Sequence, residues 1–248
     1  MAFKIETAFT TDPGLNPHKQ LNEDSVLILE KDAIFAVADG VGGAHAGDLA
    51  SQTAVRTITD VAQTQKRGHQ FDGARFIKEL IEAANDAVLE LSENSTRTIA
   101  STIAIMAMVG NTAYLGHLGD SRIYVFRDGL LSQLTRDHSQ VQELLDRSPG
   151  SPLVSEKGDD QFLGRNVITQ ALGVEQVVRP DIQKVILKKG DLFLLCTDGV
   201  YTCISNKELS NIFENNGRSP ADVCKIVLKK CHANGANDHL SAIVIRLE

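Results

Sequence analysis

The feature that most constrains this chain is an apolar strand that ends abruptly on a carboxylate. The run Phe35–Ala38 stops at Asp39, and glycines follow at positions 40, 42, 43 and 47. A carboxylate beside a core is costly unless a partner compensates its charge. A bound metal ion, an anion held at a helix N-terminus, or a hydrogen-bonded turn could each explain the arrangement, and the rest of the sequence has to decide among them.

The same pattern, an acid beside glycine or serine at the end of an apolar strand, occurs elsewhere in the chain. It is found at Asp24, Asp120, Asp198 and, before the last strand, Asp238. Taken singly, an Asp-Gly pair is most often a turn. Together, however, acids at five strand ends indicate a shared cation site, and oxygen ligands are those that Mg²⁺ and Mn²⁺ prefer. Two such ions can polarise a phosphoryl group for in-line hydrolysis.

Other kinds of site find little support. The seven histidines are scattered and form no zinc motif, and the chain contains no Gly-Lys dipeptide, which excludes a P-loop. His138 lies between Asp137 and Ser139, but adjacent residues cannot adopt the geometry of a catalytic triad. We therefore expect Asp137 to cap a short helix.

The order of the elements indicates the fold class. Strand patterns cover residues 3–9, 26–29 and 33–39, and return densely from 101 to 126 and from 182 to 197, with a last strand at 240–247. Asp128-Gly129 reads as a hairpin turn. Helical patterns come in two pairs, over residues 50–61 and 77–91, and from Ser205 and Ser219 onward. Paired helices that do not alternate with strands favour an α+β fold with antiparallel sheets packed face to face, and a single domain over residues 1–248.

Composition narrows the partners. The 248 residues carry a net charge of −7 and no basic block, so nucleic acid is not expected as a partner. No apolar run approaches the roughly 20 residues of a membrane span, and the N-terminus does not resemble a secretory signal. The four cysteines form no CxxC pair and are expected to be free thiols of a reducing cytosol. These observations predict a cytoplasmic protein.

At this point the sequence resembles a known family, the metal-dependent protein phosphatases (PPM, type 2C serine/threonine phosphatases), and above all its compact bacterial members. The resemblance rests on eight fragments in family order: LNEDS (21–25), FAVADGVGG (35–43), ASTIAI (100–105), HLGDSRIY (117–124), LTRDHS (134–139), NVITQALG (166–173), LFLLCTDGV (192–200) and NDHLSAIVI (237–245). Each fragment is weak alone, but their collinearity is specific.

The resemblance implies a four-layer α/β/β/α sandwich with a dinuclear Mn²⁺ or Mg²⁺ site in a cleft at one end. Its metal ligands would be Asp39 and the Gly40 carbonyl, Asp198, Asp238, Glu23 and Asp24 (the last two largely through water), with Asp120 helping to hold a third ion. Asp39 would bridge the two principal ions. The irregular segment 147–165 would correspond to the family's flap beside the cleft.

The activity implied is hydrolysis of phosphoserine and phosphothreonine in proteins, by in-line attack of a hydroxide that bridges the two ions. The substrates would be targets of a cognate serine/threonine kinase, and the enzyme would be a monomer. Two alternatives stay open. One is a non-catalytic member that binds phosphoproteins or regulates them, and the other is a metallohydrolase of small phosphoesters.

Three positions depart from the family pattern. Lys19 stands where an arginine usually grips the substrate phosphate, and lysine supplies a point charge without the bidentate fork. Val41 occupies the place of a histidine proposed as general acid in many eukaryotic members. His239 replaces the usual asparagine after Asp238, which would alter how Asp238 is oriented. Lys19 remains the candidate that binds the substrate phosphate.

Overall fold

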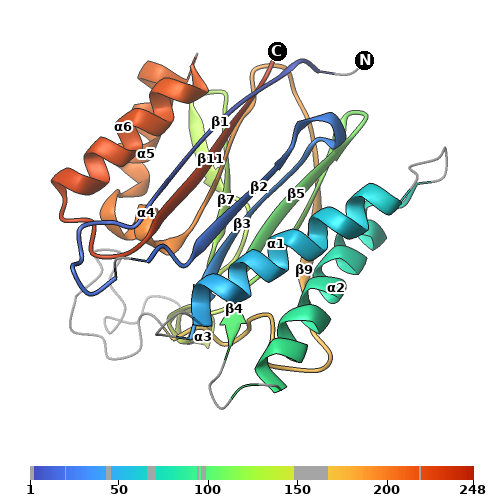
Figure 1. Cartoon of the computed structure of the whole chain (residues 1–248). Coiled ribbons are helices and arrows are strands. Elements are labelled where there is room, and N and C mark those ends of the chain that lie inside the picture. The colour runs from blue at the N-terminus through green and yellow to red at the C-terminus, as the bar shows by residue number, and fades with distance from the viewer. Residues whose placement is uncertain are drawn as a thin grey trace.

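A computed structural model describes residues 3–19, 21–42, 46–65, 71–93, 95, 99–147, 167–217 and 219–248. Two β-sheets pack face to face, and helices cover the outer face of each (Figure 1). The first sheet has the order β1-β11-β10-β7-β8 and the second the order β2-β3-β5-β6-β9, with β4 paired to β3. The predicted α/β/β/α arrangement is confirmed, although the expected flap, residues 147–165, lies outside the described residues after Arg147.

The first sheet is formed by β1 (Ile5–Asp12), β7 (Arg122–Arg127), β8 (Leu130–Gln133), β10 (Leu192–Cys196) and β11 (Leu240–Leu247). The second is formed by β2 (Asp24–Leu29), β3 (Ile34–Val41), β4 (Ala100–Ser101), β5 (Ile103–Val109), β6 (Thr112–Leu118) and β9 (Asp181–Ile186). All of these pairings are antiparallel. The turn between β7 and β8 has positive φ at Asp128 (54°) and Gly129 (79°), as a tight hairpin requires.

The helices are α1 (Ala46–Thr64), α2 (Gly73–Glu93), α3 (Gln140–Arg147), α4 (Asp198–Cys203), α5 (Asn206–Asn216) and α6 (Pro220–Ala233), with a short 3₁₀ turn at Glu30–Asp32. Helices α1 and α2 bury the predicted apolar stripes on the second sheet, and α5 and α6 cover the first. A capping box of Ser205 and Glu208 begins α5, at the residue where the sequence pattern placed the helix start. No described helix is both long enough and apolar enough to cross a membrane.

Apolar packing occupies three layers. Between the sheets lie alternate residues of the strands, among them Phe35, Val37, Phe193 and Ile243, all fully buried. The other two layers fill the space between each sheet and its helix pair. Strands buried on both faces explain the near-continuous apolar runs in the sequence. The cysteines are free thiols in or beside these layers, as predicted.

Two local expectations were wrong or incomplete. Helix α3 is capped by Ser139, whose Oγ accepts the Gln142 N–H at 3.2 Å, whereas Asp137 forms an ion pair with Arg122. The short helix α4 directly follows β10 and was not predicted, because six residues carry too little periodicity to reveal a helix.

The topology gathers the acids at one end of the sandwich. Asp24 begins β2 and Asp39 lies near the end of β3, and the two are register partners across that antiparallel pair. Likewise Asp198 follows β10, Asp238 precedes β11, and these strands are also antiparallel neighbours. The chain termini lie at the opposite end of the sheets (Figure 1).

Candidate metal centre

Asp39 is held by its backbone. Its N–H donates to Thr102 Oγ1 at 3.0 Å, and its carbonyl accepts from the Thr102 N–H at 2.8 Å and from Ser101 Oγ at 3.0 Å. All of these contacts are made by the backbone of Asp39, so its carboxylate is not needed to hold the strand in place. Because Asp24 is its partner in the register, the two side chains lie on the same face of the sheet.

Thr197 joins the two sheets at this end. Its hydroxyl donates to Asp24 Oδ2 at 2.7 Å and accepts the Ser241 N–H at 3.1 Å. Thr197 belongs to the first sheet's side of the sandwich and Asp24 to the second. One fully buried hydroxyl therefore fixes the position of Asp24 relative to Asp198, the residue that follows Thr197.

Two glycines let helix α1 approach strand β3. A Cβ on Gly40 would lie 1.9 Å from the Gly47 carbonyl oxygen, and one on Gly47 would lie 2.6 Å from the Gly40 oxygen. The same Gly47 position would be 2.8 Å from Glu23 Cδ, which places the Glu23 carboxyl at the start of α1. Two of the glycines that follow Asp39, Gly40 and Gly47, are therefore needed for close packing at the acid cluster.

The acids perturb one another. Burial, and then the neighbouring charges of Asp120 and Asp238, raise the pKa of Asp198 to about 7. Burial above all raises the pKa of Asp24 to about 7, and burial followed by the charges of Asp198 and Asp24 raises the pKa of Asp39 well above its ordinary value. We call Asp24, Asp39, Asp120, Asp198 and Asp238 the acid cluster.

The donor set of the acid cluster fits a divalent cation. Asp24 Oδ1 and Asp198 Oδ1 are buried and have no hydrogen-bond partner among the described residues. A buried carboxylate oxygen without a donor is unfavourable, and a cation would satisfy it. All the ligand atoms that these aspartates offer are oxygens, which Mn²⁺ and Mg²⁺ prefer, whereas softer metals prefer thiolate ligands.

Lys19 and His239 both lie at the acid cluster. Lys19 Nζ forms an ion pair with Asp238 Oδ1 at 2.5 Å. His239 Nδ1 accepts the Glu23 N–H at 3.3 Å, and the His239 N–H donates to Asp238 Oδ1 at 2.9 Å. The histidine thus ties Glu23 to Asp238 through its ring and its backbone. Val41, at the other departure from the family pattern, is 42% exposed and offers no proton donor.

Asp120 is anchored by a tyrosine. Tyr201 Oη donates to Asp120 Oδ2 at 3.1 Å, and the Arg122 guanidinium carbon lies 3.5 Å from the centre of the Tyr201 ring. Burial, and then the Asp120 and Asp198 charges, raise the pKa of Tyr201 well above its ordinary value, so its hydroxyl stays a donor. Burial, followed by the charge of Asp137, also raises the pKa of Asp120.

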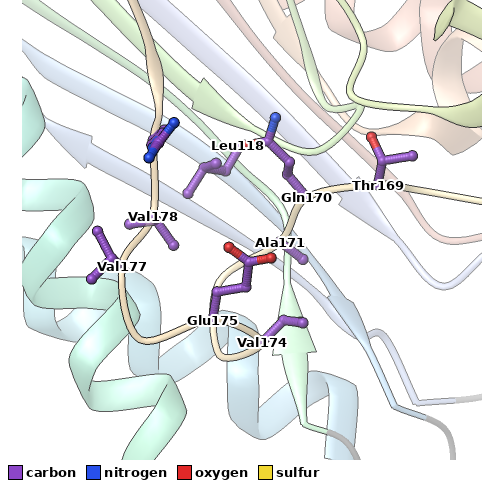
Figure 2. Close-up of a pocket in the computed structure, with 9 residues that line it drawn as sticks. Leu118, Thr169, Gln170, Ala171, Val174, Glu175, Val177 and Val178 are labelled. Atoms are coloured by element: carbon purple, nitrogen blue, oxygen red, sulfur yellow. The ribbon is translucent and has the colours of Figure 1, made fainter.

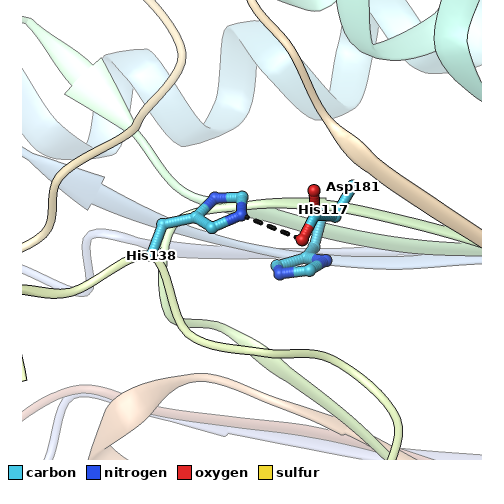
Figure 3. Close-up of side chains that lie close together, drawn as sticks. All are labelled: His117, His138 and Asp181. Atoms are coloured by element: carbon cyan, nitrogen blue, oxygen red, sulfur yellow. Dashed lines mark ion pairs between the residues drawn. The ribbon is translucent and has the colours of Figure 1, made fainter. Parts of the chain in front are cut away.

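A second group of possible metal ligands lies at the edge between β6 and β9. His117, His138 and Asp181 offer ligand atoms within 4.8 Å of one another, and Figure 3 shows the Asp181 carboxylate facing the His138 ring. The two imidazoles stack with centroids 4.6 Å apart. His138 Nδ1 accepts the Gly119 N–H, so its proton resides on Nε2, which faces Asp181 Oδ2 at 3.4 Å. Because that proton occupies the Nε2 lone pair, this arrangement favours a hydrogen-bonded support for the Gly119 turn over a metal ion.

A pocket of about 320 Å³ lies beside the end of β6 (Figure 2). Leu118, Val174 and Val178 contribute apolar walls, and Glu175 contributes a carboxylate. None of the acid cluster lines it. The pocket is therefore separate from the candidate metal centre.

The structure brings together most of the residues singled out from the sequence. The five acids of the cluster and Lys19 converge, and Gly40 lies beside them, while the Glu23 carboxyl lies at the edge, against Gly47. Sequence reasoning missed Thr197, Thr102 and Tyr201. A hydroxyl next to an expected metal acid was the available signal for Thr197, but its partner is 173 positions away in sequence.

Comparison with known proteins finds a matching family and similar sequences. The family model described as protein phosphatase 2C matches residues 17–244. The protein phosphatase PhpP of Streptococcus pneumoniae is 32% identical over 219 residues, which cover 86% of this chain and 85% of that protein.

Solved structures agree. The Streptococcus agalactiae serine/threonine phosphatase superposes with a TM-score of 0.88 at 26% identity, covering 99% of this chain and 100% of that chain. The catalytic domain of the serine/threonine phosphatase PstP, in complex with two manganese ions, gives a TM-score of 0.83 at 26% identity, covering 99% of each chain.

Proposed function

This chain belongs to the protein phosphatase 2C family and is a metal-dependent serine/threonine protein phosphatase, and we propose that the acid cluster is the metal centre of its reaction. The observation that supports this most is the pair of buried, unpartnered oxygens on Asp24 and Asp198 within a group of mutually repelling carboxylates. Asp39, Asp198, Asp238 and the Gly40 carbonyl would hold two Mn²⁺ or Mg²⁺ ions.

Around these ligands other residues have supporting roles. Asp24 and Glu23 would complete the site from the start of β2 and from the loop before it, and Asp120 would help to hold a third ion. When bound, the ions would supply the positive charge that activates water and polarises a phosphate ester. The protein's own part is to hold the carboxylates together, through Thr197, Thr102 and the close-packed glycines, against their repulsion.

The whole chain, residues 1–248, acts as one catalytic domain under this proposal. Its substrates are phosphorylated proteins, the targets of a separate serine/threonine kinase. Val41 offers no proton donor, so the leaving group would take its proton from a water molecule at the site or would depart with less assistance.

The decisive test measures hydrolysis of p-nitrophenyl phosphate and of a phosphothreonine peptide. It compares the unmodified protein in Mn²⁺ with the same protein in EDTA, and with the Asp39→Asn variant in Mn²⁺. We expect EDTA and Asp39→Asn each to lower kcat by at least about 100-fold, as loss of a principal electrostatic contribution does. Asp128→Asn is the matched control, since it makes the same chemical change in an exposed hairpin turn and should leave kcat unchanged. Full activity in EDTA would refute the proposed centre.

Lys19 is the proposed phosphate-binding residue, supported by its place at the acid cluster. Lys19→Arg adds a bidentate donor, so we expect KM for the phosphopeptide to fall roughly threefold to tenfold, the effect of one added charge-assisted hydrogen bond of about 1 kcal/mol. Lys19→Gln should raise KM instead. If neither variant changes KM, Lys19 does not bind the phosphate.

A further inference from the structure

Tyr201 links two acids of the cluster, because it lies on the same short helix as Asp198 and contacts Asp120. Helix α4 begins at Asp198, and Tyr201 follows three positions later, so both project from the same side of one helical turn. The Tyr201 hydroxyl reaches across to Asp120 Oδ2 at 3.1 Å, on the loop between β6 and β7. The segment that carries one carboxylate thus restrains another.

The position of the Tyr201 ring is itself fixed. The Arg122 guanidinium lies over its face, and Arg122 is anchored by Asp137, with its Nε and Nη2 donating to the carboxylate at 2.6–3.2 Å. Arg122 Nη1 also donates to Tyr124 Oη at 3.0 Å. A planar guanidinium held at both ends gives the tyrosine little rotational freedom.

Asp120 gains a defined orientation from this chain of contacts. Its side chain is 8% exposed and sits among like charges, so it cannot rely on solvent to orient it. With Oδ2 held by Tyr201, the carboxylate is restricted to one direction relative to Asp198. Groups that orient a metal ligand in this way typically change metal affinity about 10- to 100-fold when removed.

We propose that Tyr201 is a positioning residue for cation binding: it holds one oxygen of Asp120 and so presets that carboxylate for the ion that depends on it. The inference rests on the proposed function, in that it takes Asp120 to be a cation ligand. It goes further by naming a residue outside the ligand set that controls how tightly the Asp120-dependent ion binds.

The test measures Mn²⁺ binding by titration calorimetry on the full metal-free chain and on Tyr201→Phe. The Phe variant keeps the ring and its packing under Arg122 and removes only the hydroxyl. We expect the Asp120-dependent binding event to weaken about 10-fold, and the Mn²⁺ concentration needed for half-maximal peptide hydrolysis to rise by the same factor, with KM for the peptide unchanged.

Tyr124→Phe is the matched control. It removes another buried hydroxyl on the same guanidinium, but one that does not touch Asp120. We expect its Mn²⁺ affinity to equal that of the unmodified chain. Equal weakening by both Phe variants would mean that Arg122 scaffolding matters and not the contact with Asp120, and would overturn the proposal.

Asp120→Asn separates this proposal from the proposed function. Tyr201→Phe should add no further loss of affinity in the Asp120→Asn background, because that background already lacks the carboxylate through which Tyr201 is proposed to act. A full additional loss there, or no effect of Tyr201→Phe in the unmodified chain, overturns the role of Tyr201. Mn²⁺ binding that survives Asp39→Asn unchanged would instead refute the metal centre itself.

A spectroscopic readout is also available, because the chain has three tyrosines and no tryptophan. Mn²⁺ should perturb the near-ultraviolet tyrosine absorption of the unmodified chain and of Tyr124→Phe. The perturbation should be lost in Tyr201→Phe. Its persistence in Tyr201→Phe would show that Tyr201 does not sense the bound ion.

Discussion

At the scale of single residues, Asp198 illustrates what it costs to gather carboxylates. Burial and the charges of Asp120 and Asp238 raise its pKa to about 7, so the folded protein binds its proton more tightly than the unfolded chain does. A raised carboxyl pKa means that folding stability falls as pH rises from about 4 to about 7, and stays low above that range. Removing this charge should therefore increase the folding stability of the metal-free protein at high pH.

We expect Asp198→Asn to raise Tm of the metal-free protein at pH 8, on the order of 3 °C for a gain of ~1 kcal/mol in a chain of this size. Near pH 4 the native carboxyl is protonated and the difference should vanish. Thermal denaturation in EDTA at both pH values measures this, with Asp128→Asn as the exposed control. A variant that is equally destabilised at both pH values would contradict the electrostatic explanation.

At the scale of elements, the approach of α1 to β3 decides where the cluster lies. The end of β3 and the first turn of α1 touch through Gly40 and Gly47, with no room for a side chain on either. This contact also places Glu23 at the helix start. A change in this packing should therefore affect the metal site without removing any ligand atom, since even a substitution of Gly40 keeps its backbone carbonyl.

Gly40→Ala tests this. The added Cβ would lie 1.9 Å from a backbone oxygen, so α1 has to shift. Overpacking costs about 1–3 kcal/mol, and we expect Tm to fall by several degrees and Mn²⁺ affinity to weaken together. Calorimetry and thermal denaturation measure the two effects.

Gly129→Asn is the control, since nothing lies within 4 Å of Gly129 and asparagine tolerates its positive φ. It should change neither quantity. If Gly40→Ala lowers Tm but leaves Mn²⁺ affinity intact, the packing of α1 does not govern the metal site.

At the scale of the whole molecule, the acid cluster lies where the two sheets meet. Asp24 and Asp39 come from the second sheet, whereas Asp198 follows strand β10 and Asp238 precedes strand β11 of the first. Thr197 supplies a hydrogen bond between the two sides. A cation bound by both groups would reinforce the sandwich at the end where these carboxylates repel one another, opposite the chain termini.

Much of this arrangement could be predicted from the sequence. Apolar strands with acids at their ends, paired helices and hairpin turns are local patterns, and they indicated the α+β sandwich, the five acids and oxygen ligation. The collinear fragments identified the family. These properties can be predicted from the sequence because each depends on residues that are near one another in the chain.

Only the tertiary structure showed how the acids are held. Thr197 meets Asp24 across 173 positions, and Tyr201 meets Asp120 across 81 positions, from a helix too short to leave a periodic pattern. Asp137 was predicted to cap a helix. Instead it forms an ion pair with Arg122, and that contact depends on the position of β7 in the folded structure. The sequence determined which residues carry charge to the strand ends; the partners that orient those charges were decided by packing, because contacts between distant segments exist only once the sheets have closed.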